Sequence, residues 1–196
     1  MFTGIVQELG LVRSVRSSAL TIELSGAFRD CIDLGGSVAV NGVCLSASDL
    51  PPGAFVADLS KETASRTTLG RLRPGQHVNL ELPLSPNSGL DGHWVLGHVD
   101  AQGRVQALYQ EGAGWTLIVE FPLQYRRFIA EKGSIAVEGI SLTPYDLDGG
   151  CFHCAIIPET YENTVLKDRR RGHSVNLEFD ILAKYVERMI RFVHSD

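Results

Sequence analysis

The sequence has few cysteines, no long apolar run and no excess of basic residues. Its four cysteines (Cys31, Cys44, Cys151 and Cys154) are too few and too unevenly spaced for a disulfide framework, so we expect a reducing, cytoplasmic location. No apolar stretch approaches the roughly 20 residues that span a bilayer, and the first residues predict no secretory signal. The net charge of −5 argues against a nucleic-acid-binding surface.

What the sequence does contain is a long internal repeat. Residues 36–46 read G-S-V-A-V-N-G-V-C-L-S, and residues 133–143 read G-S-I-A-V-E-G-I-S-L-T. The same offset of 97 residues relates V-N-L-E at 78–81 to V-N-L-E at 175–178. A period of this length indicates two small domains and not a solenoid. We expect one domain over residues 1–92, a second over residues 93–180 and a C-terminal segment over residues 181–196.

The pattern within each half predicts short strands separated by turns. Residues 18–24 alternate apolar and polar side chains, and Asn41-Gly42 is a strong hairpin signal. We therefore expect an all-β fold with a β-barrel or a β-sandwich in each half. A helix is predicted after Pro122, and a longer one after Asp180.

The helix after Asp180 has an apolar stripe. The stripe packs either on its own domain or on copies of itself in an oligomer. Its members recur at helical spacing: Ile181, Leu182, Tyr185, Val186, Met189, Ile190 and Val193.

The repeated motif places short polar side chains at equivalent positions in the two halves. Along a strand, Cys44 and Ser46 share one face, and so do Ser141 and Thr143. Two matched polar pockets would suit two copies of one small ligand. The alternative is that this face is simply hydrated.

Three other motifs have a weaker chemical reading. His93 and His98 fit a metal site poorly at a spacing of five; a proton-transfer role is the better functional hypothesis, and a hydrated strand end is the alternative. The two sulfurs of Cys151 and Cys154 would face opposite sides of a strand, which argues against a redox pair. The basic run 167–171 indicates a solvated turn, with a weak anion site as the alternative.

Several motifs occur in order along the chain: M-F-T-G-I-V at the start, N-G-V-C-L-S, K-E-T, G-H-V-D, K-G-S-I-A-V-E-G-I-S-L-T, I-P-E-T and V-N-L-E. Together they resemble the motifs of the riboflavin synthase family. The resemblance covers essentially the whole chain. It implies a tandem pair of similar six-stranded Greek-key β-barrels and a C-terminal helix that joins three subunits.

The resemblance also implies a reaction that needs no external cofactor and no metal. Two molecules of 6,7-dimethyl-8-ribityllumazine exchange a four-carbon unit, giving riboflavin and 5-amino-6-ribitylamino-uracil. The site would lie between the N-terminal barrel of one subunit and the C-terminal barrel of its neighbour. The chain would then be a cytoplasmic, homotrimeric transferase of riboflavin biosynthesis.

Carried over position by position, the resemblance implies residues for catalysis and binding. His98 would assist proton transfer at the 7-methyl group; Cys44, Ser141 and Thr143 would bond the rings or deliver a nucleophile, and Ser37 would support them. The substrate-binding set is Gly4, Ile5, Val6, Cys44, Leu45, Ser46, Asp58, Leu59, Ser60, Lys61, Glu62, Thr63, Gly97, His98, Val99, Lys132, Ser141, Leu142, Thr143, Ala155, Ile156, Ile157, Pro158, Glu159 and Thr160.

Ser60, Glu138 and Pro144 depart from the family's usual residues, and Pro144 should bend its strand or place it at a sheet edge. Two other functions compete with the enzyme. Non-catalytic relatives bind a lumazine or flavin but tend to lose the residues that stand here as Cys44 and His98. A flavin-binding reductase would need a nicotinamide domain, and the sequence has no G-x-G-x-x-G unit.

Overall fold

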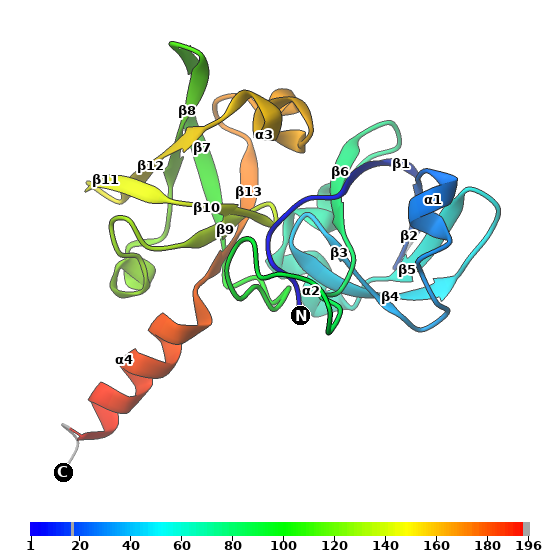
Figure 1. Cartoon of the computed structure of the whole chain (residues 1–196), viewed down its shortest axis with the longest axis horizontal. Helices are drawn as coiled ribbons and strands as arrows, with labels where there is room; N and C mark the ends of the chain where they lie inside the picture. The colour runs from blue at the N-terminus through cyan, green and yellow to red at the C-terminus, as the bar shows by residue number, and fades with distance from the viewer. Residues whose placement is uncertain (17, 194–196) are drawn as a thin grey trace.

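The computed structural model describes residues 1–16 and 18–193, and these form two β-units with one helix extending from the second (Figure 1). The first unit is a closed barrel in the order β1-β2-β5-β4-β3-β6, with every neighbouring pair antiparallel. Its strands are β1 (Glu8–Arg16), β2 (Ala19–Glu23), β3 (Ser37–Val40), β4 (Val43–Asp49), β5 (Ala54–Asp58) and β6 (His77–Glu81).

The second unit is a curled sheet of seven strands in the order β10-β9-β13-β7-β8-β12-β11. Its strands are β7 (Ala101–Glu111), β8 (Gly114–Glu120), β9 (Ile135–Val137), β10 (Ile140–Leu142), β11 (Pro144–Asp148), β12 (Cys151–Ile156) and β13 (Ser174–Phe179). β10 and β11 together occupy the place of β4 in the first barrel. They are separate strands because Pro144 has no N–H to donate to a ladder. The predicted all-β tandem fold is confirmed, and of the two effects expected of Pro144 the structure shows the edge position, because β11 begins at Pro144 and is the last strand of the sheet.

The repeated motif forms the same tight hairpin in both units. Asn41-Gly42 joins β3 to β4 with φ angles of 46° and 76°, and Glu138-Gly139 joins β9 to β10 with φ angles of 51° and 78°. Two successive positive φ angles are typical of a type I′ turn, which matches the twist of the flanking strands. The hairpin predicted from Asn41-Gly42 is therefore confirmed, and its repeat shares the geometry.

Each unit has its own apolar core. Leu45 and the equivalent residue of the repeat, Leu142, are 5% and 8% exposed and face these cores, so Cys44 and Ser141 lie on the opposite faces of their strands.

Short helices connect the strands: α1 (Gly26–Arg29), α2 (Lys61–Arg66), η1 (Thr68–Arg71), η2 (Leu123–Phe128), α3 (Pro158–Glu162) and η3 (Val165–Asp168). The helix expected after Pro122 is thus only one short 3-10 element.

The C-terminal helix α4 (Ile181–Val193) begins where Asp180 was predicted to cap it, and the Asp180 carboxylate accepts a hydrogen bond from the Leu182 N–H at 2.9 Å. Residues 194–196 of the expected C-terminal segment lie outside the described residues. Within residues 1–16 and 18–193, no helix is both long enough and apolar enough to cross a membrane.

Candidate functional site

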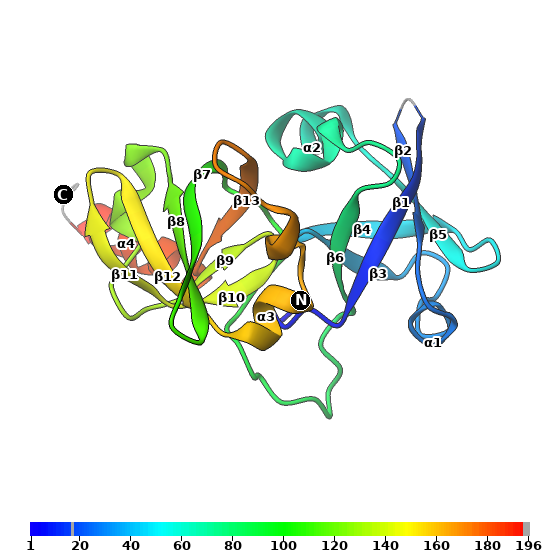
Figure 2. The same cartoon turned by 90° about the horizontal axis from the view of Figure 1, so that it is seen from above.

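The N-terminus lies between the two units in both views (Figures 1 and 2). Phe2 and Val95 pair there in an antiparallel bridge, and the His93 N–H donates to the Thr3 carbonyl at 3.1 Å, so residues 2–3 and 93–95 run side by side in opposite directions. The loops at Gly4 and Gly97 both leave this junction between the units. Each loop crosses from its own half to the repeated motif of the other half.

The loop at Gly97 lies on the strand that carries Cys44. The Cys44 N–H donates to the Gly97 carbonyl at 2.9 Å, and a Cβ at Gly97 would lie 2.5 Å from Cys44 Cβ. Cys44 is half-buried, while the neighbouring His98 side chain is exposed. The structure therefore brings predicted residues Cys44, Gly97 and His98 together.

The loop at Gly4 makes the equivalent contact with the strand that carries Ser141. The Ser141 N–H donates to the Gly4 carbonyl at 2.8 Å, and a Cβ at Gly4 would lie 2.7 Å from Ser141 Cβ. Val6 packs on the core of the second unit. Gly4 and Gly97 therefore lie against two different strands, one in each half.

His93 contacts Ser141, which the sequence did not reveal. Its Nδ1 lies 2.7 Å from Ser141 Oγ, while its buried Nε2 has no hydrogen-bond partner. Burial lowers the pKa of His93, whereas Asp180 acts in the opposite direction. A neutral imidazole beside a serine hydroxyl can accept the hydroxyl proton or orient the hydroxyl oxygen. A hydrated strand end was the alternative considered for His93, and for this residue it is wrong because His93 is only 6% exposed.

Predicted binding residues 58–63 and 155–160 lie on the short helices α2 and α3 and at the ends of the strands β5 and β12 that lead to them. Ser60 caps α2, because its hydroxyl accepts a hydrogen bond from the Thr63 N–H at 3.0 Å. Residues 155–158 line a hollow of about 330 Å³ beside Trp115, whose ring stacks on Tyr161 at 3.8 Å between centroids. Lys132 Nζ lies 5.3 Å from the centre of the Tyr145 ring. The remaining predicted positions are exposed or half-buried, except for a few that face a core: Leu45, Leu59, Leu142 and Ile156.

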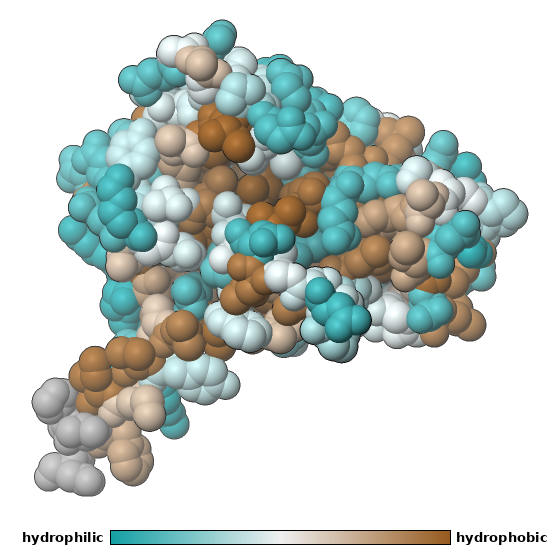
Figure 3. All heavy atoms as spheres, viewed as in Figure 1, coloured by the Kyte–Doolittle hydropathy of each residue, from teal (hydrophilic) through white to brown (hydrophobic). Residues whose placement is uncertain are grey.

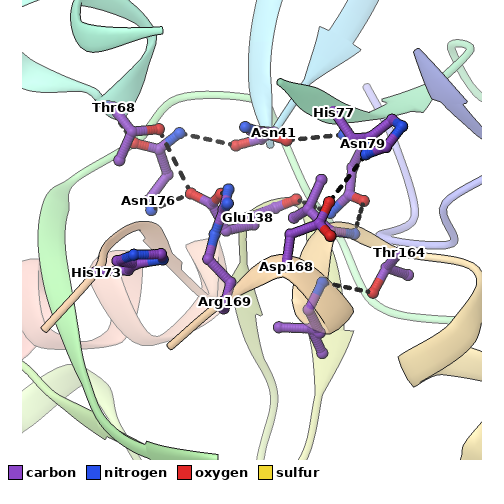
Figure 4. A network of polar contacts seen from close by, with 12 residues as sticks. Asn41, Thr68, His77, Asn79, Glu138, Thr164, Asp168, Arg169, His173 and Asn176 are labelled. Carbon is purple, nitrogen blue, oxygen red and sulfur yellow. Dashed lines mark hydrogen bonds and ion pairs between the residues drawn. The ribbon is translucent and has the colours of Figure 1, made fainter. Parts of the chain in front are cut away.

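A pseudo-symmetric set of hydrogen bonds fixes the two units to each other (Figure 4). The side-chain amide of Asn79 donates to the carbonyl of Glu138 at 2.9 Å, and that of Asn176 donates to the carbonyl of Asn41 at 3.0 Å. The Asn79 and Asn176 N–H groups donate to the Asn41 and Glu138 side chains, at 2.7 Å each. All four residues are almost fully buried, so these bonds determine how the two repeated motifs face each other.

Glu138 is the one charged member of this set. Its carboxylate pairs with the Arg169 guanidinium, which neutralises a side chain with no exposed surface. A hollow of about 580 Å³ opens beside it, lined by Arg71, His77, Asp168 and others. In this hollow Arg71 donates to Gln102, Arg169 pairs with Glu138, and His77 lies 2.9 Å from Asp168. Of these arginines only Arg169 has a carboxylate partner among the described residues, since Arg71 donates to the neutral amide of Gln102, and the weak anion site considered for residues 167–171 stays a prediction.

The cysteine and histidine motifs show no redox or metal geometry. Cys154 is buried and Cys151 half-buried, both are free thiols, and burial raises the pKa of Cys154 to about 12. Within residues 1–16 and 18–193, no group of three or more potential ligand side chains is arranged to hold a metal ion.

Glu178, at the end of β13, is a buried carboxylate that holds the Gly97 loop. It accepts hydrogen bonds from the N–H groups of Leu96, Gly97 and His98 at 2.6, 2.9 and 3.0 Å. Burial raises the pKa of Glu178 from 4.5 to about 7, although the Leu96 N–H, Lys184 and the Gly97 N–H lower it; Asp100 adds to the rise. The loop is thus held by a group that titrates near neutral pH.

This pKa predicts a specific pH dependence of stability. A raised pKa in the fold means that the contribution of Glu178 is fully present below pH 4.5 and is lost as the pH rises through about 7. Wild type should lose stability between pH 5 and pH 8, and Glu178→Gln should not. The free energy of unfolding of Glu178→Gln relative to wild type should therefore be higher at pH 8 than at pH 5, by on the order of 3 kcal/mol. Urea unfolding of both proteins at both pH values measures this difference. An equal effect of the substitution at the two pH values would contradict it.

Comparison with known proteins matches the repeat to a family. Residues 3–83, and again residues 96–180, match the lumazine binding domain family. The chain is 45% identical to the riboflavin synthase of Mycobacterium bovis, over 97% of this chain and 98% of that protein. The chain belongs to the riboflavin synthase family.

Other members of the riboflavin synthase family and several solved structures extend this result. Riboflavin synthases of Photobacterium phosphoreum and Bacillus subtilis are 38% and 35% identical to the chain, covering 97% and 100% of it and 89% and 91% of their own length. Structures of LumP in complex with 6,7-dimethyl-8-(1'-D-ribityl) lumazine and with riboflavin superpose with TM-scores of 0.83 and 0.86. At 20% and 21% identity, over 91% of this chain and 99% of LumP, they show the shared fold.

Proposed function

We propose that the chain is a riboflavin synthase. It converts two molecules of 6,7-dimethyl-8-ribityllumazine into riboflavin and 5-amino-6-ribitylamino-uracil by transfer of a four-carbon unit. The observation that carries this proposal is the 45% identity with a riboflavin synthase over nearly the whole of both chains. The retained Cys44 and His98 support the enzyme over the binding protein, because non-catalytic relatives tend to lose these residues.

The repeat gives a physical reason for a reaction between two identical molecules. Each half offers one short polar side chain, Cys44 or Ser141, against a glycine loop from the other half. Two lumazines bound in these equivalent places can take different roles, one as donor and one as acceptor of the four carbons. Orientation of two bound reactants can supply roughly 7–11 kcal/mol of the rate enhancement.

The two places differ in their proton chemistry, which fits two different roles. Ser141 has His93 on its hydroxyl, so this pair can activate a nucleophile or a water molecule. Cys44 has the exposed His98 in the adjoining loop, and His98 is our candidate for proton transfer at the 7-methyl group. Thr143 and Ser37 complete the proposed polar groups, and the exposed and half-buried members of the binding set named from the sequence line the two ligand positions.

We further propose that the chain forms a trimer through α4 and that the domains divide at residues 92 and 180. Over residues 182–190 the apolar stripe of α4 is exposed and not packed on its own unit, and Tyr185 and Met189 are 63% and 67% exposed. Figure 3 shows apolar residues along this protruding helix. The polar side is held in place, since Lys184 binds Asp100 at 2.6 Å and Glu187 binds Arg127 at 2.9 Å. An exposed apolar stripe on a fixed helix favours contact with copies of the chain. Three is the number of copies that the family resemblance implies.

The trimer predicts a mass in solution of three times 21.4 kDa. In the double variant Val186→Glu with Met189→Glu, the mass measured by sedimentation equilibrium should fall to that of one chain, because trimer formation would bury two charges in each helix. Arg188→Gln, at an exposed position of the same helix, is the control and should leave the trimer intact. A wild-type protein that sediments as one chain at micromolar concentration would contradict the proposal.

The proposed activity is tested by incubating the purified protein with 6,7-dimethyl-8-ribityllumazine alone and following riboflavin by its absorbance. Riboflavin should form without any added cofactor. Tight binding of the lumazine with no riboflavin would instead identify a binding protein, and would direct attention to Ser60, Glu138 and Pro144.

A further inference from the structure

Two buried glutamates end the repeated V-N-L-E segments and make the same kind of contact. Glu81 accepts hydrogen bonds from the Thr3 N–H at 2.6 Å, the Thr3 hydroxyl at 2.9 Å and the Gly4 N–H at 3.0 Å. Glu178 accepts three N–H groups from residues 96–98. Glu81 and Glu178 are only 4% and 3% exposed. Each carboxylate therefore fixes a short loop through several charge-assisted hydrogen bonds.

Each fixed loop crosses to the other half of the chain. Glu81 belongs to the first unit, yet the loop it holds presents the Gly4 carbonyl to the Ser141 N–H of the second. Glu178 belongs to the second unit, yet its loop presents the Gly97 carbonyl to the Cys44 N–H of the first. The position of each loop relative to the polar side chain that it meets therefore depends on one carboxylate in the opposite unit.

We propose that Glu81 and Glu178 are crossed positioning residues: each fixes the loop that completes the ligand site of the other half. This inference rests on the proposed function for its catalytic meaning, and it deepens that function by making each half responsible for the geometry of the other's site. Neither carboxylate need touch the substrate. Glu81 acts on the Ser141 site through Gly4, and Glu178 acts on the Cys44 site through Gly97.

The energetics of a buried carboxylate support a role beyond simple packing. Taking a carboxylate out of water is unfavourable, and burial raises the pKa of both glutamates. An apolar side chain would fill the same volume without that desolvation penalty. Groups that lower stability while fixing a precise geometry are concentrated at functional sites. The same arrangement occurs independently in both halves of the chain, which supports a shared role.

Backbone amide exchange tests the crossing directly. Hydrogen–deuterium exchange would be followed at the Cys44 and Ser141 amides, which donate to the two loops. Glu178→Ala removes every acceptor of its loop, so the Cys44 amide should exchange about tenfold faster or more, while the Ser141 amide is unchanged. Glu81→Ala should give the reverse pattern.

Two further sets of variants keep the test decisive. Glu178→Gln and Glu81→Gln preserve the side-chain shape but turn an NH₂ group toward one loop N–H, so each should show a smaller effect at the same crossed amide. They serve if the alanine variants fail to fold. Glu120→Gln, at an exposed position of β8, should change neither amide. Faster exchange at both amides in every Glu81 and Glu178 variant would overturn the proposal, because that is the signature of general destabilisation.

A kinetic measurement separates this inference from the proposed function. If the chain makes riboflavin, Glu178→Gln and Glu81→Gln should each lower kcat by about tenfold with a smaller change in KM, because a misplaced loop lowers the fraction of well-oriented complexes. A wild-type protein that makes no riboflavin would remove the proposed function but leave the exchange result to decide the positioning. Unchanged exchange and unchanged kcat in these variants would overturn the positioning alone.

Discussion

Replacing Gly139 with alanine is expected to lower the free energy of unfolding by about 3–5 kcal/mol. Gly139 has φ at +78°, and a Cβ there would lie 2.6 Å from the backbone nitrogen of Gly42 and 2.8 Å from its Cα. Both the strained backbone and the clash contribute to this loss. Since Gly42 and Gly139 are the tips of the two repeated hairpins, the clash should also loosen the contact between the units. Urea unfolding followed by circular dichroism measures the effect.

Gly112 provides a matched control for this substitution. It also has a positive φ, at 60°, but a Cβ there would meet nothing within 4 Å. Gly112→Ala should therefore show only the backbone penalty, about 1–2 kcal/mol. If Gly139→Ala were no more destabilised than Gly112→Ala, the close approach of the two hairpin tips would not contribute to stability, and our account of the interface between the units would be wrong.

Replacing His98 with alanine is expected to lower kcat by about 10²–10⁴-fold while KM stays within a few-fold of wild type. His98 follows Gly97, whose carbonyl accepts the Cys44 N–H, and its own N–H is bound to Glu178. The backbone contacts of this loop are therefore retained in the variant, and only the imidazole is lost. Steady-state turnover of 6,7-dimethyl-8-ribityllumazine measures the change.

His77 is a suitable control for the loss of a histidine. It is exposed, lines the hollow of about 580 Å³ between the units and pairs with Asp168. Neither His77 nor Asp168 belongs to the proposed site. His77→Ala should keep wild-type kcat. A His98→Ala protein with turnover within about threefold of wild type would contradict the proton-transfer role, since general acid–base groups contribute far more than this.

Much of the fold followed from the sequence because it is encoded twice. The Asn41-Gly42 turn has a specific conformational requirement, and the repeat extended the same expectation to Glu138-Gly139. The effect of Pro144 also followed from chemistry alone, since proline lacks an N–H. The closed geometry of the first barrel depends on pairing between strands distant in the chain, which local patterns do not specify.

The site was only partly predictable for the same reason. The motif identified Cys44 and Ser141 as equivalent positions, and strand alternation put them opposite Leu45 and Leu142. The crossing of the glycine loops did not follow, because it depends on how two units pack. The contact of His93 with Ser141 was missed because the two residues are 48 positions apart in the sequence. The V-N-L-E repeat was visible, and a charged residue ending an apolar strand twice was the available signal for Glu81 and Glu178.

The molar ratio of riboflavin formed to 6,7-dimethyl-8-ribityllumazine consumed tests the central claim most directly. The account requires that one lumazine supplies four carbons to another, with no other reactant. Incubation of the protein with lumazine alone should therefore give one riboflavin for every two lumazines consumed, together with one 5-amino-6-ribitylamino-uracil. One riboflavin for each lumazine consumed, or no riboflavin despite binding, would contradict it.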